Sequence, residues 1–366
     1  MMRRCVWLVV VLAWVCAAEA APKHTQRVIL VTADGLRWQE LFSGIDPMLM
    51  KEKEAGMQDA PQLRDRLWSD SAVERRRRLM PFFWTQLAPR GVVLGNVRRD
   101  SPVRVTNAYR VSYPGYSEIL TGRAQDDAVR GNDPIQNPVQ TVLEFVRQKL
   151  SLKRPDVALF GSWATFDVIG ESRPGTVFIN SGFRELPAPP LSTRMDELSR
   201  LQFQVLTPWR EVRHDYITFE MALEYLKSQS PRLAYIALGE TDDWAHDRRY
   251  DRVLETALHF DQQLRRLWET LQSMPAYKGK TTLLVTSDHG RGSTLEDWHS
   301  HGDDVDGAEY IWIAAIGPDT PAAGEISSAD EYFQRDIAPT LLELAGIDST
   351  EYEGVKGSPI RLFLKP

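Results

Sequence analysis

The chain is poor in cysteine and has no excess of positive charge. Its two cysteines, Cys5 and Cys16, both lie within the first twenty of its 366 residues. A chain without that segment has no disulfide, no thiolate metal ligand and no cysteine nucleophile, so any metal site must use histidine and carboxylate side chains. The formal net charge of -6 argues against nucleic acid as a general partner, because a phosphate backbone attracts a basic surface.

The N-terminal apolar run is too short to span a membrane. It covers residues 6–18, whereas a helical span needs about 20 apolar residues. Two arginines precede this run, and Ala18-Glu19-Ala20 then fits the small-x-small rule for signal cleavage. We therefore predict that residues 1–20 are a signal peptide and that residues 21–366 form an exported domain, periplasmic or secreted, without stable membrane insertion. Lipid attachment at Cys16 is an alternative, but two bulky residues precede that cysteine.

No internal repeat, low-complexity linker or glycine-rich phosphate loop interrupts the chain. Short β-branched runs alternate with amphipathic segments, a pattern typical of a parallel or mixed sheet with helices on both faces. We predict a single α/β domain with a mixed, mostly parallel central sheet. The expected strands are 27–32, 92–94, 156–160, 176–179, 233–238, 281–286 and 310–316. The expected helices are 81–87, 139–150, 216–227, 252–271 and 336–345, and a loop or lid is expected over 184–200, which contains three prolines.

A strongly charged stretch covers residues 51–80 and includes four consecutive arginines, 75–78. This run could bind anions, or it could be the solvated face of an inserted helix. The second interpretation is preferred, because charge runs on helices usually face solvent.

Acidic and histidine side chains gather directly after three predicted strands and in one loop. In open α/β sheets ligands bind outside the carboxyl ends of the strands, so the three strand-end segments can converge on one edge of the sheet. Two residues four apart share a face if a helix begins there, and carboxylate with imidazole suits zinc, or manganese where carboxylates dominate. The candidate metal ligands are Asp34; Asp242 and His246; Asp288 and His289; and His299 or His301.

Ser112 is the candidate nucleophile for such a metal pair. It stands just before Pro114-Gly115, which we expect to precede a short helix. A helix start offers backbone N–H groups to a phosphoryl oxygen, and a metal can ionise a serine hydroxyl. The alternative is that Ser112 is an ordinary helix N-cap.

Together these segments resemble the alkaline phosphatase superfamily, in particular its phosphodiesterase or nucleotide pyrophosphatase-like branch. The resemblance runs in order from about residue 27 to 346. It rests on five motifs: Asp34-Gly35; Ser112-Tyr113-Pro114 with Thr121-Gly122; Asp242 with His246; Ser287-Asp288-His289-Gly290; and His301-Gly302.

The resemblance implies a metal-dependent hydrolase of small-molecule phosphoric esters, diester or monoester, that works through a phosphoseryl intermediate. It implies two divalent ions, zinc or else manganese, one held by Asp242, His246 and His301. The other is held by Asp34, Asp288, His289 and the Ser112 oxygen. His301 is preferred to His299 because a glycine follows it. Sulfate ester or phosphonate hydrolysis, and a non-catalytic metal-binding protein of the same fold, are the alternatives.

Several positions bear on the choice of substrate. Gly115 stands where the phosphodiesterase branch usually has Asn, and Tyr116 stands where sulfatases have Arg. Maturation of Ser112 to a formylglycine is therefore not expected. Monoesterases often supply a cation to the extra phosphate charge, and Arg110 and Arg123 flank the nucleophile segment.

Overall fold

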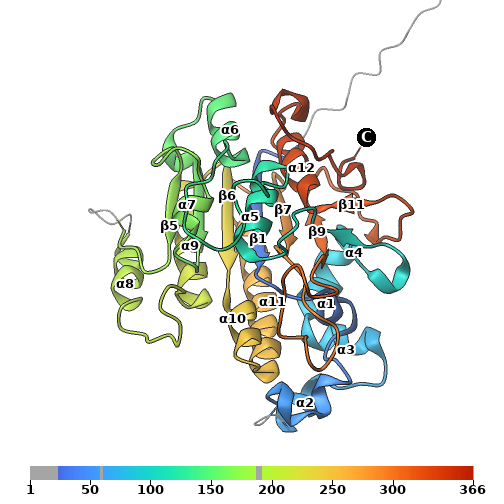
Figure 1. Cartoon of the computed structure of the whole chain (residues 1–366). Coiled ribbons are helices and arrows are strands. Elements are labelled where there is room, and N and C mark those ends of the chain that lie inside the picture. Colours follow the sequence, from blue (N-terminus) through green and yellow to red (C-terminus); the bar gives the residue numbers. More distant parts are fainter. Residues whose placement is uncertain (1–23, 58–60, 187–191, 366) are drawn as a thin grey trace, which may run out of the picture.

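A central sheet of eight strands forms the core of the molecule (Figure 1). The computed structural model describes residues 24–57, 61–186 and 192–365, so the predicted signal peptide lies outside the described residues. The strand order is β10-β2-β9-β7-β1-β6-β4-β5. In chain order the strands are β1 (Arg27–Ala33), β2 (Val92–Leu94), β4 (Val157–Gly161), β5 (Phe178–Ser181), β6 (Leu233–Leu238), β7 (Thr281–Thr286), β9 (Ile313–Ile316) and β10 (Gly324–Glu325).

The centre of this sheet is parallel. β1 pairs in parallel with β6 on one side and with β7 on the other, while β9 runs antiparallel to both β7 and β2. The register places Thr32 beside Ala237 and Thr286, so the three central strands end at the same level. Segments that follow these strands therefore emerge side by side at one edge of the sheet.

Helices cover both faces of the sheet. Ile29 and Val31 of β1 pack into one core, whereas Val28 and Leu30 pack into the other, since successive side chains of a strand point to opposite faces. The first core includes residues of α1 (Trp38–Ser43), α3 (Ala72–Leu79), α9 (Asp215–Gln229) and α11 (Tyr250–Ser273). The second includes residues of α5 (Ser112–Thr121), α6 (Val142–Lys149), α7 (Phe166–Ile169) and α12 (Ile337–Leu344). The predicted fold class is confirmed.

The remaining elements are short. They are α2 (Pro61–Leu67), α4 (Ala88–Arg90), α8 (Thr193–Leu201), α10 (Glu240–His246), a π-helical turn at Phe83–Leu87, and a small sheet of β11 (Tyr332–Phe333), β3 (Val103–Arg104) and β8 (Tyr310–Ile311). Single 3-10 turns occupy Leu49–Lys51, Lys53–Ala55, Val97–Arg99, Arg154–Asp156, Gln334–Asp336, Ser349–Glu351 and Arg361–Phe363. Of the helices that the structure describes, none is both long and apolar enough to cross a membrane.

Three expected elements differ from the structure. Within the expected lid 184–200, residues from Thr193 onward form α8, because the Ser192 side chain accepts a hydrogen bond from the Met195 N–H and caps the helix. The expected strand 310–316 is two strands, β8 and β9, in different sheets. The helix expected from residue 139 begins only at Val142, where Thr141 and Glu144 form a capping box.

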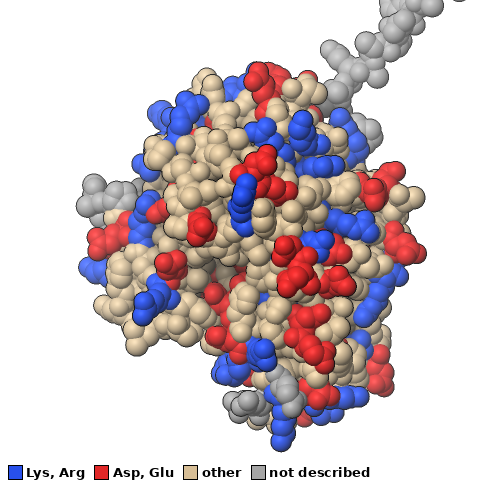
Figure 2. All heavy atoms as spheres, in the orientation of Figure 1, with Lys and Arg blue, Asp and Glu red and all other residues tan. Residues whose placement is uncertain are grey.

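The four arginines 75–78 lie on or beside α3, and each contacts an acceptor within the protein. Arg76 and Arg77 pair with Glu325 and Glu74 at 2.7 and 3.0 Å, and Arg78 contacts the Trp68 carbonyl. Arg75 is buried rather than solvated and donates to the Ser43 carbonyl at 3.1 Å. The predicted helix is present, but its expected solvated face is confirmed only for Arg77 and Arg78, whereas Arg75 and Arg76 bond to the rest of the domain. On the face shown in Figure 2, acidic and basic side chains are interspersed.

Candidate active site

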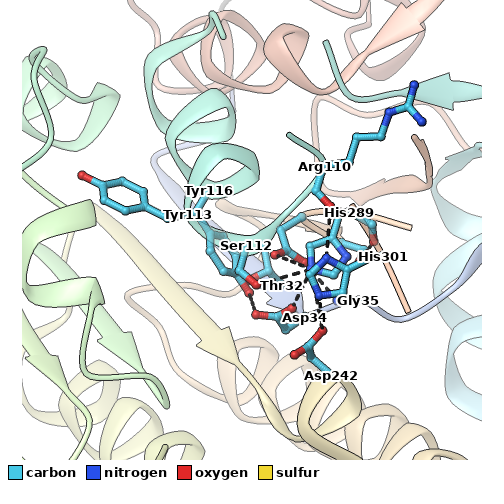
Figure 3. A network of polar contacts seen from close by, with 12 residues as sticks. Thr32, Asp34, Gly35, Arg110, Ser112, Tyr113, Tyr116, Asp242, His289 and His301 are labelled. Atoms are coloured by element: carbon cyan, nitrogen blue, oxygen red, sulfur yellow. Dashed lines mark hydrogen bonds and ion pairs between the residues drawn. The ribbon is translucent and has the colours of Figure 1, made fainter. Parts of the chain in front are cut away.

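The ends of the three central strands bring the predicted site residues together (Figure 3). Asp34 directly follows β1, and its N–H donates to the Leu238 carbonyl at the end of β6 at 2.9 Å. α10 begins just after β6 and carries Asp242. One residue, Ser287, separates the end of β7 from Asp288. Because β6, β1 and β7 are neighbours, side chains more than 200 residues apart in sequence share one small volume.

The first ligand group consists of Asp34, Asp288 and His289, whose nearest ligand atoms lie within 4.8 Å of one another. The His289 Nε2 atom lies 3.3 Å from Asp34 Oδ1 and 3.5 Å from Asp288 Oδ2. Both carboxylate oxygens are buried and have no hydrogen-bond partner among the described residues. A buried charged oxygen without a partner is costly. A divalent cation between these atoms would satisfy both, so the residues fit the metal that the sequence predicts.

The second ligand group consists of Asp242, His246 and His301. α10 places Asp242 and His246 one turn apart, with Oδ2 and Nε2 separated by 3.2 Å. His301 comes from the loop after β7; its Nε2 lies 3.0 Å from His246 Nε2 and 3.6 Å from Asp242 Oδ1. The His246 side chain is 49% exposed, so this group is open to solvent at His246, while the first group is buried. His299, the alternative ligand, lies outside both groups.

Two of the imidazoles are oriented by backbone carbonyls. The Nδ1 of His289 lies 2.9 Å from the Gly290 carbonyl, and the Nδ1 of His301 lies 3.1 Å from the Arg110 carbonyl. A carbonyl only accepts, so each Nδ1 carries a proton and each ring turns its Nε2 toward the cluster. The backbone of Arg110 has φ 50°, and in this conformation its carbonyl meets His301. The Arg110 N–H donates to Asn107 Oδ1 at 2.8 Å.

The charges in the cluster are strongly coupled. Burial alone would lower the pKa of His289, but the carboxylates of Asp288 and Asp34 raise it to about 9. Burial, together with the charge of Asp34, raises the pKa of Asp288 well above its usual value. Burial and the nearby His289 charge lower the pKa of His301 and of His246. The carboxylates of the first group therefore favour positive charge beside them, whereas the second group favours neutral imidazoles, which is the form in which histidine binds a metal.

Ser112 is the first residue of α5, and its hydroxyl oxygen lies 3.4 Å from His289 Nε2. The N-cap residue is Val111, so the N-cap interpretation of Ser112 is wrong. Pro114 and Gly115 lie inside the first turn instead of preceding the helix, which suits proline because that turn lacks acceptors for its N–H groups. A Cβ at Gly115 would stand 2.4 Å from the Asp288 carbonyl oxygen. Glycine is required because the helix start packs on that backbone.

The two arginines that flank the nucleophile segment do not face the cluster. Figure 3 shows the Arg110 side chain directed away from Ser112, and its guanidinium lies 3.5 Å from Glu309. Arg123 donates to the Gly354 carbonyl at 3.4 Å. Neither supplies a cation to the space around the Ser112 hydroxyl.

Sequence reasoning missed three polar residues that contact the site. The Tyr116 hydroxyl donates to Asp34 Oδ2 at 2.9 Å, and the Arg291 guanidinium contacts the Asp242 carboxylate. Asn132 Oδ1 accepts from the Tyr113 N–H, beside Ser112, at 2.9 Å. Tyr116 lies between Pro114 and Thr121 of the nucleophile motif, and Arg291 directly follows Ser287-Asp288-His289-Gly290; these positions are the signal that could have drawn attention to them.

Comparison with known proteins agrees with this arrangement. The family model of type I phosphodiesterase / nucleotide pyrophosphatase matches residues 51–315, more than two thirds of the chain. The chain belongs to this family. The match begins after Asp34. It includes Ser112, the Asp242–His246 and Asp288–His289 segments, and His301.

Solved structures of alkaline phosphatase superfamily members share the fold of this chain. An alkaline phosphatase, PafA, aligns with a TM-score of 0.61 at 12% identity over 94% of this chain and 100% of that one. A phosphonate monoester hydrolase from Silicibacter pomeroyi aligns with a TM-score of 0.54 at 14% identity, covering 93% and 76% of the two chains. A 2-O GAG sulfatase aligns with a TM-score of 0.56 at 14% identity, covering 93% and 74%. The predicted alkaline phosphatase-like fold is confirmed.

One curated protein is also similar in sequence. A 2,3-bisphosphoglycerate-independent phosphoglycerate mutase of Haloarcula marismortui is 25% identical over 143 residues, which are 38% of this chain. The match spans only a quarter of that protein's length.

Proposed function

We propose that this member of the family is a two-metal hydrolase of phosphoric esters in which Ser112 is the nucleophile. The observation that carries the proposal is the position of the Ser112 hydroxyl, 3.4 Å from His289, beside two ligand groups that are each built from carboxylate and imidazole. Asp34, Asp288 and His289 would hold one ion, and Asp242, His246 and His301 the other. Zinc suits this donor set, and manganese is the alternative.

The chain's own residues would carry the reaction in two steps. Bound metal supplies positive charge that stabilises the phosphoryl oxygens and favours ionisation of the serine hydroxyl. The ionised Ser112 oxygen attacks phosphorus and the P–O bond to the leaving group breaks; the departing oxygen takes up a proton in place of the one that the serine lost, and the phosphoryl group remains on Ser112. Water then attacks that phosphoserine and releases the phosphate product, which restores the serine. Each step inverts phosphorus, so the whole reaction proceeds with retention.

We further propose diesters as the preferred substrates. A monoester carries one more negative charge than a diester, and monoesterases often meet it with an additional cation. Arg110 is turned toward Glu309 and Arg123 toward Gly354. Without a cation from either residue, a singly charged diester is the better match. Sulfate esters are a less favoured alternative, because Tyr116 replaces the arginine that follows the nucleophile in sulfatases.

The signal peptide and the exported location remain part of this proposal. N-terminal sequencing of protein recovered from the medium or the periplasm should begin near residue 21. An intact Met1 on exported protein held in a membrane would contradict it.

The Ser112→Ala variant tests the nucleophile, and Ser117→Ala is its matched control. Ser117 is buried in the same helix, and its hydroxyl has no hydrogen-bond partner among the described residues. With an aryl phosphodiester, Ser112→Ala should lose turnover by a factor on the order of 10³ to 10⁶ while it retains both metal ions. Ser117→Ala should remain within about twofold of the wild type.

Stereochemistry and substrate comparison complete the test. A phosphodiester made chiral with sulfur should react with retention, and aryl monoesters and sulfates should react more slowly than the diester. Near-normal turnover by Ser112→Ala, or inversion at phosphorus, would show that water attacks directly. If the wild type binds metal but hydrolyses none of these esters, the alternative of a non-catalytic metal-binding protein would be supported instead.

A further inference from the structure

Arg291 is a buried cation that the proposed reaction does not use. It stands two residues after His289, and its side chain is almost completely enclosed, with 2% of the residue exposed. Its Nε–H donates to the Gly35 carbonyl at 3.2 Å, and Nη1 donates to the His299 carbonyl. Nη2 donates to the carbonyl of Asp242 at 3.3 Å and also contacts the Asp242 carboxylate. Every N–H-bearing nitrogen of the guanidinium therefore has a partner.

These partners belong to the segments that carry the metal ligands. Gly35 follows Asp34, and His299 stands two residues before His301. Asp242 is a ligand itself, and Arg291 is attached through the backbone to Asp288 and His289. One side chain thus joins all four ligand-bearing segments, two from the first ligand group and two from the second.

The surroundings of Arg291 leave little freedom for this link to shift. A Cβ at Gly35 would stand 2.8 Å from Arg291 Nε, so the turn after β1 accepts only glycine against the guanidinium. On the other side, Arg37 donates to the Gly292 carbonyl at 3.0 Å and fixes the backbone next to Arg291. A planar guanidinium presents its donors in a fixed fork, whereas a lysine ammonium is a single flexible point charge.

Building on the proposed function, we propose that Arg291 is a positioning residue for the second metal ion. It holds Asp242 and the His299–His301 segment at a fixed distance from the buried first group. It also occupies one oxygen of the Asp242 carboxylate and leaves the other toward His246. The role depends on the fork of donors rather than on charge alone.

The experiment compares Arg291→Lys and Arg291→Met with the wild type. Zinc content is measured after equilibration at a series of free zinc concentrations set by a chelator, and the melting temperature of each metal-free protein is measured in parallel. Arg213→Met is the matched control: Arg213 is also fully buried and bonded, to Thr218, Asn180 and Gln202. Among the described residues, its hydrogen bonds reach none of the six ligand residues.

Both Arg291 variants should lose one of two zinc ions at free zinc concentrations that leave the wild type with two. The affinity for that ion should fall by about 10- to 100-fold, while the first ion stays bound. Arg213→Met should melt at a lower temperature and keep wild-type zinc affinity. If Arg291→Met does not fold, Arg291→Lys carries the test, since it keeps the charge and the stem.

The outcomes separate this inference from the proposed function. A wild type that binds fewer than two ions overturns both. A wild type with two ions, together with Arg291 variants of equal zinc affinity, overturns the positioning role alone. Wild-type affinity in Arg291→Lys but not in Arg291→Met would also overturn it, because charge without the fork would then suffice.

Discussion

Removal of the Tyr116 hydroxyl should weaken metal binding in the first ligand group without opening the core. The hydroxyl donates to Asp34 Oδ2 at 2.9 Å, and Asp34 Oδ1 is buried and has no hydrogen-bond partner among the described residues. The ring is fully buried and packs on Phe166 with centroids 4.6 Å apart. Tyr116→Phe keeps this ring, so the substitution deletes one hydrogen bond and creates only a small void.

The magnitude follows from the charge of the acceptor. A hydrogen bond to a charged group contributes about 1.5 to 3 kcal/mol, which corresponds to roughly 10- to 100-fold in an equilibrium constant. Part of this contribution is lost in the metal-free protein as well, so only the remainder appears in metal affinity. We expect zinc affinity to fall on the order of tenfold, with 100-fold as the upper bound.

Tyr235→Phe is the matched control for this measurement. Tyr235 is also fully buried, but its hydroxyl lies 3.0 Å from Thr32 Oγ1 instead of a carboxylate. Zinc affinity is measured by competition with a chelating indicator, and the stability of the metal-free proteins by thermal unfolding. Tyr235→Phe should lose stability and keep its zinc affinity. If Tyr116→Phe binds zinc as tightly as this control does, the hydroxyl does not orient Asp34 and the reasoning fails.

Three further results are expected. His301→Ala should lose one zinc ion per chain by elemental analysis while His299→Ala keeps both, since only His301 lies in the second ligand group; the reverse loss would exchange their roles. Graded chelation of the wild type should remove the ion of Asp242, His246 and His301 first. That group has one carboxylate and an exposed histidine, whereas the first group has two carboxylates and is buried. Simultaneous loss of both ions would contradict this expectation. Burial raises the pKa of Asp261 to about 6, so its stabilising contribution is present below about pH 4 and is lost as the pH rises through 6. Relative to Asp261→Asn, the wild type should therefore lose up to about 3 kcal/mol of unfolding free energy between pH 4 and 7, and a pH-independent difference in chemical denaturation would refute the assignment.

The parts of the fold that sequence predicts well are those set by local pattern. Residues 233–238 are a short apolar run and residues 281–286 combine leucine and valine with threonine, and they form β6 and β7 with the expected bounds. A strand buried on both faces is apolar or β-branched at nearly every position, so its ends are sharp in the sequence. The acidic and histidine motifs can also be found in the sequence, because each begins where one of these strand segments ends.

Other elements depend on contacts that no local pattern reports. The prolines near residue 190 favoured a loop, but the cap at Ser192 starts α8 immediately after the gap in the described residues. Residues 310–316 read as one strand because every position suits a strand. They are divided between two sheets because Tyr310–Ile311 pairs with β3, while Ile313–Ile316 pairs with β7 and β2.

The residues of the two candidate ligand groups could be named from the sequence, whereas the side chains and backbone groups that hold them could not. Asp34 is held by Tyr116, 82 residues away; Asp288 by the Gly35 N–H at 3.0 Å, 253 residues away; and Asp242 by Arg291, 49 residues away. The order of the strands in the sheet brings these distant residues together, and the spacing of the motifs along the sequence does not encode that order. In each case a donor occupies one carboxylate oxygen and leaves the other toward the neighbouring imidazole. Each carboxylate therefore presents a single oxygen to the neighbouring imidazole, where the proposed metal would bind, and this geometry is a property of the fold rather than of the carboxylate residues alone.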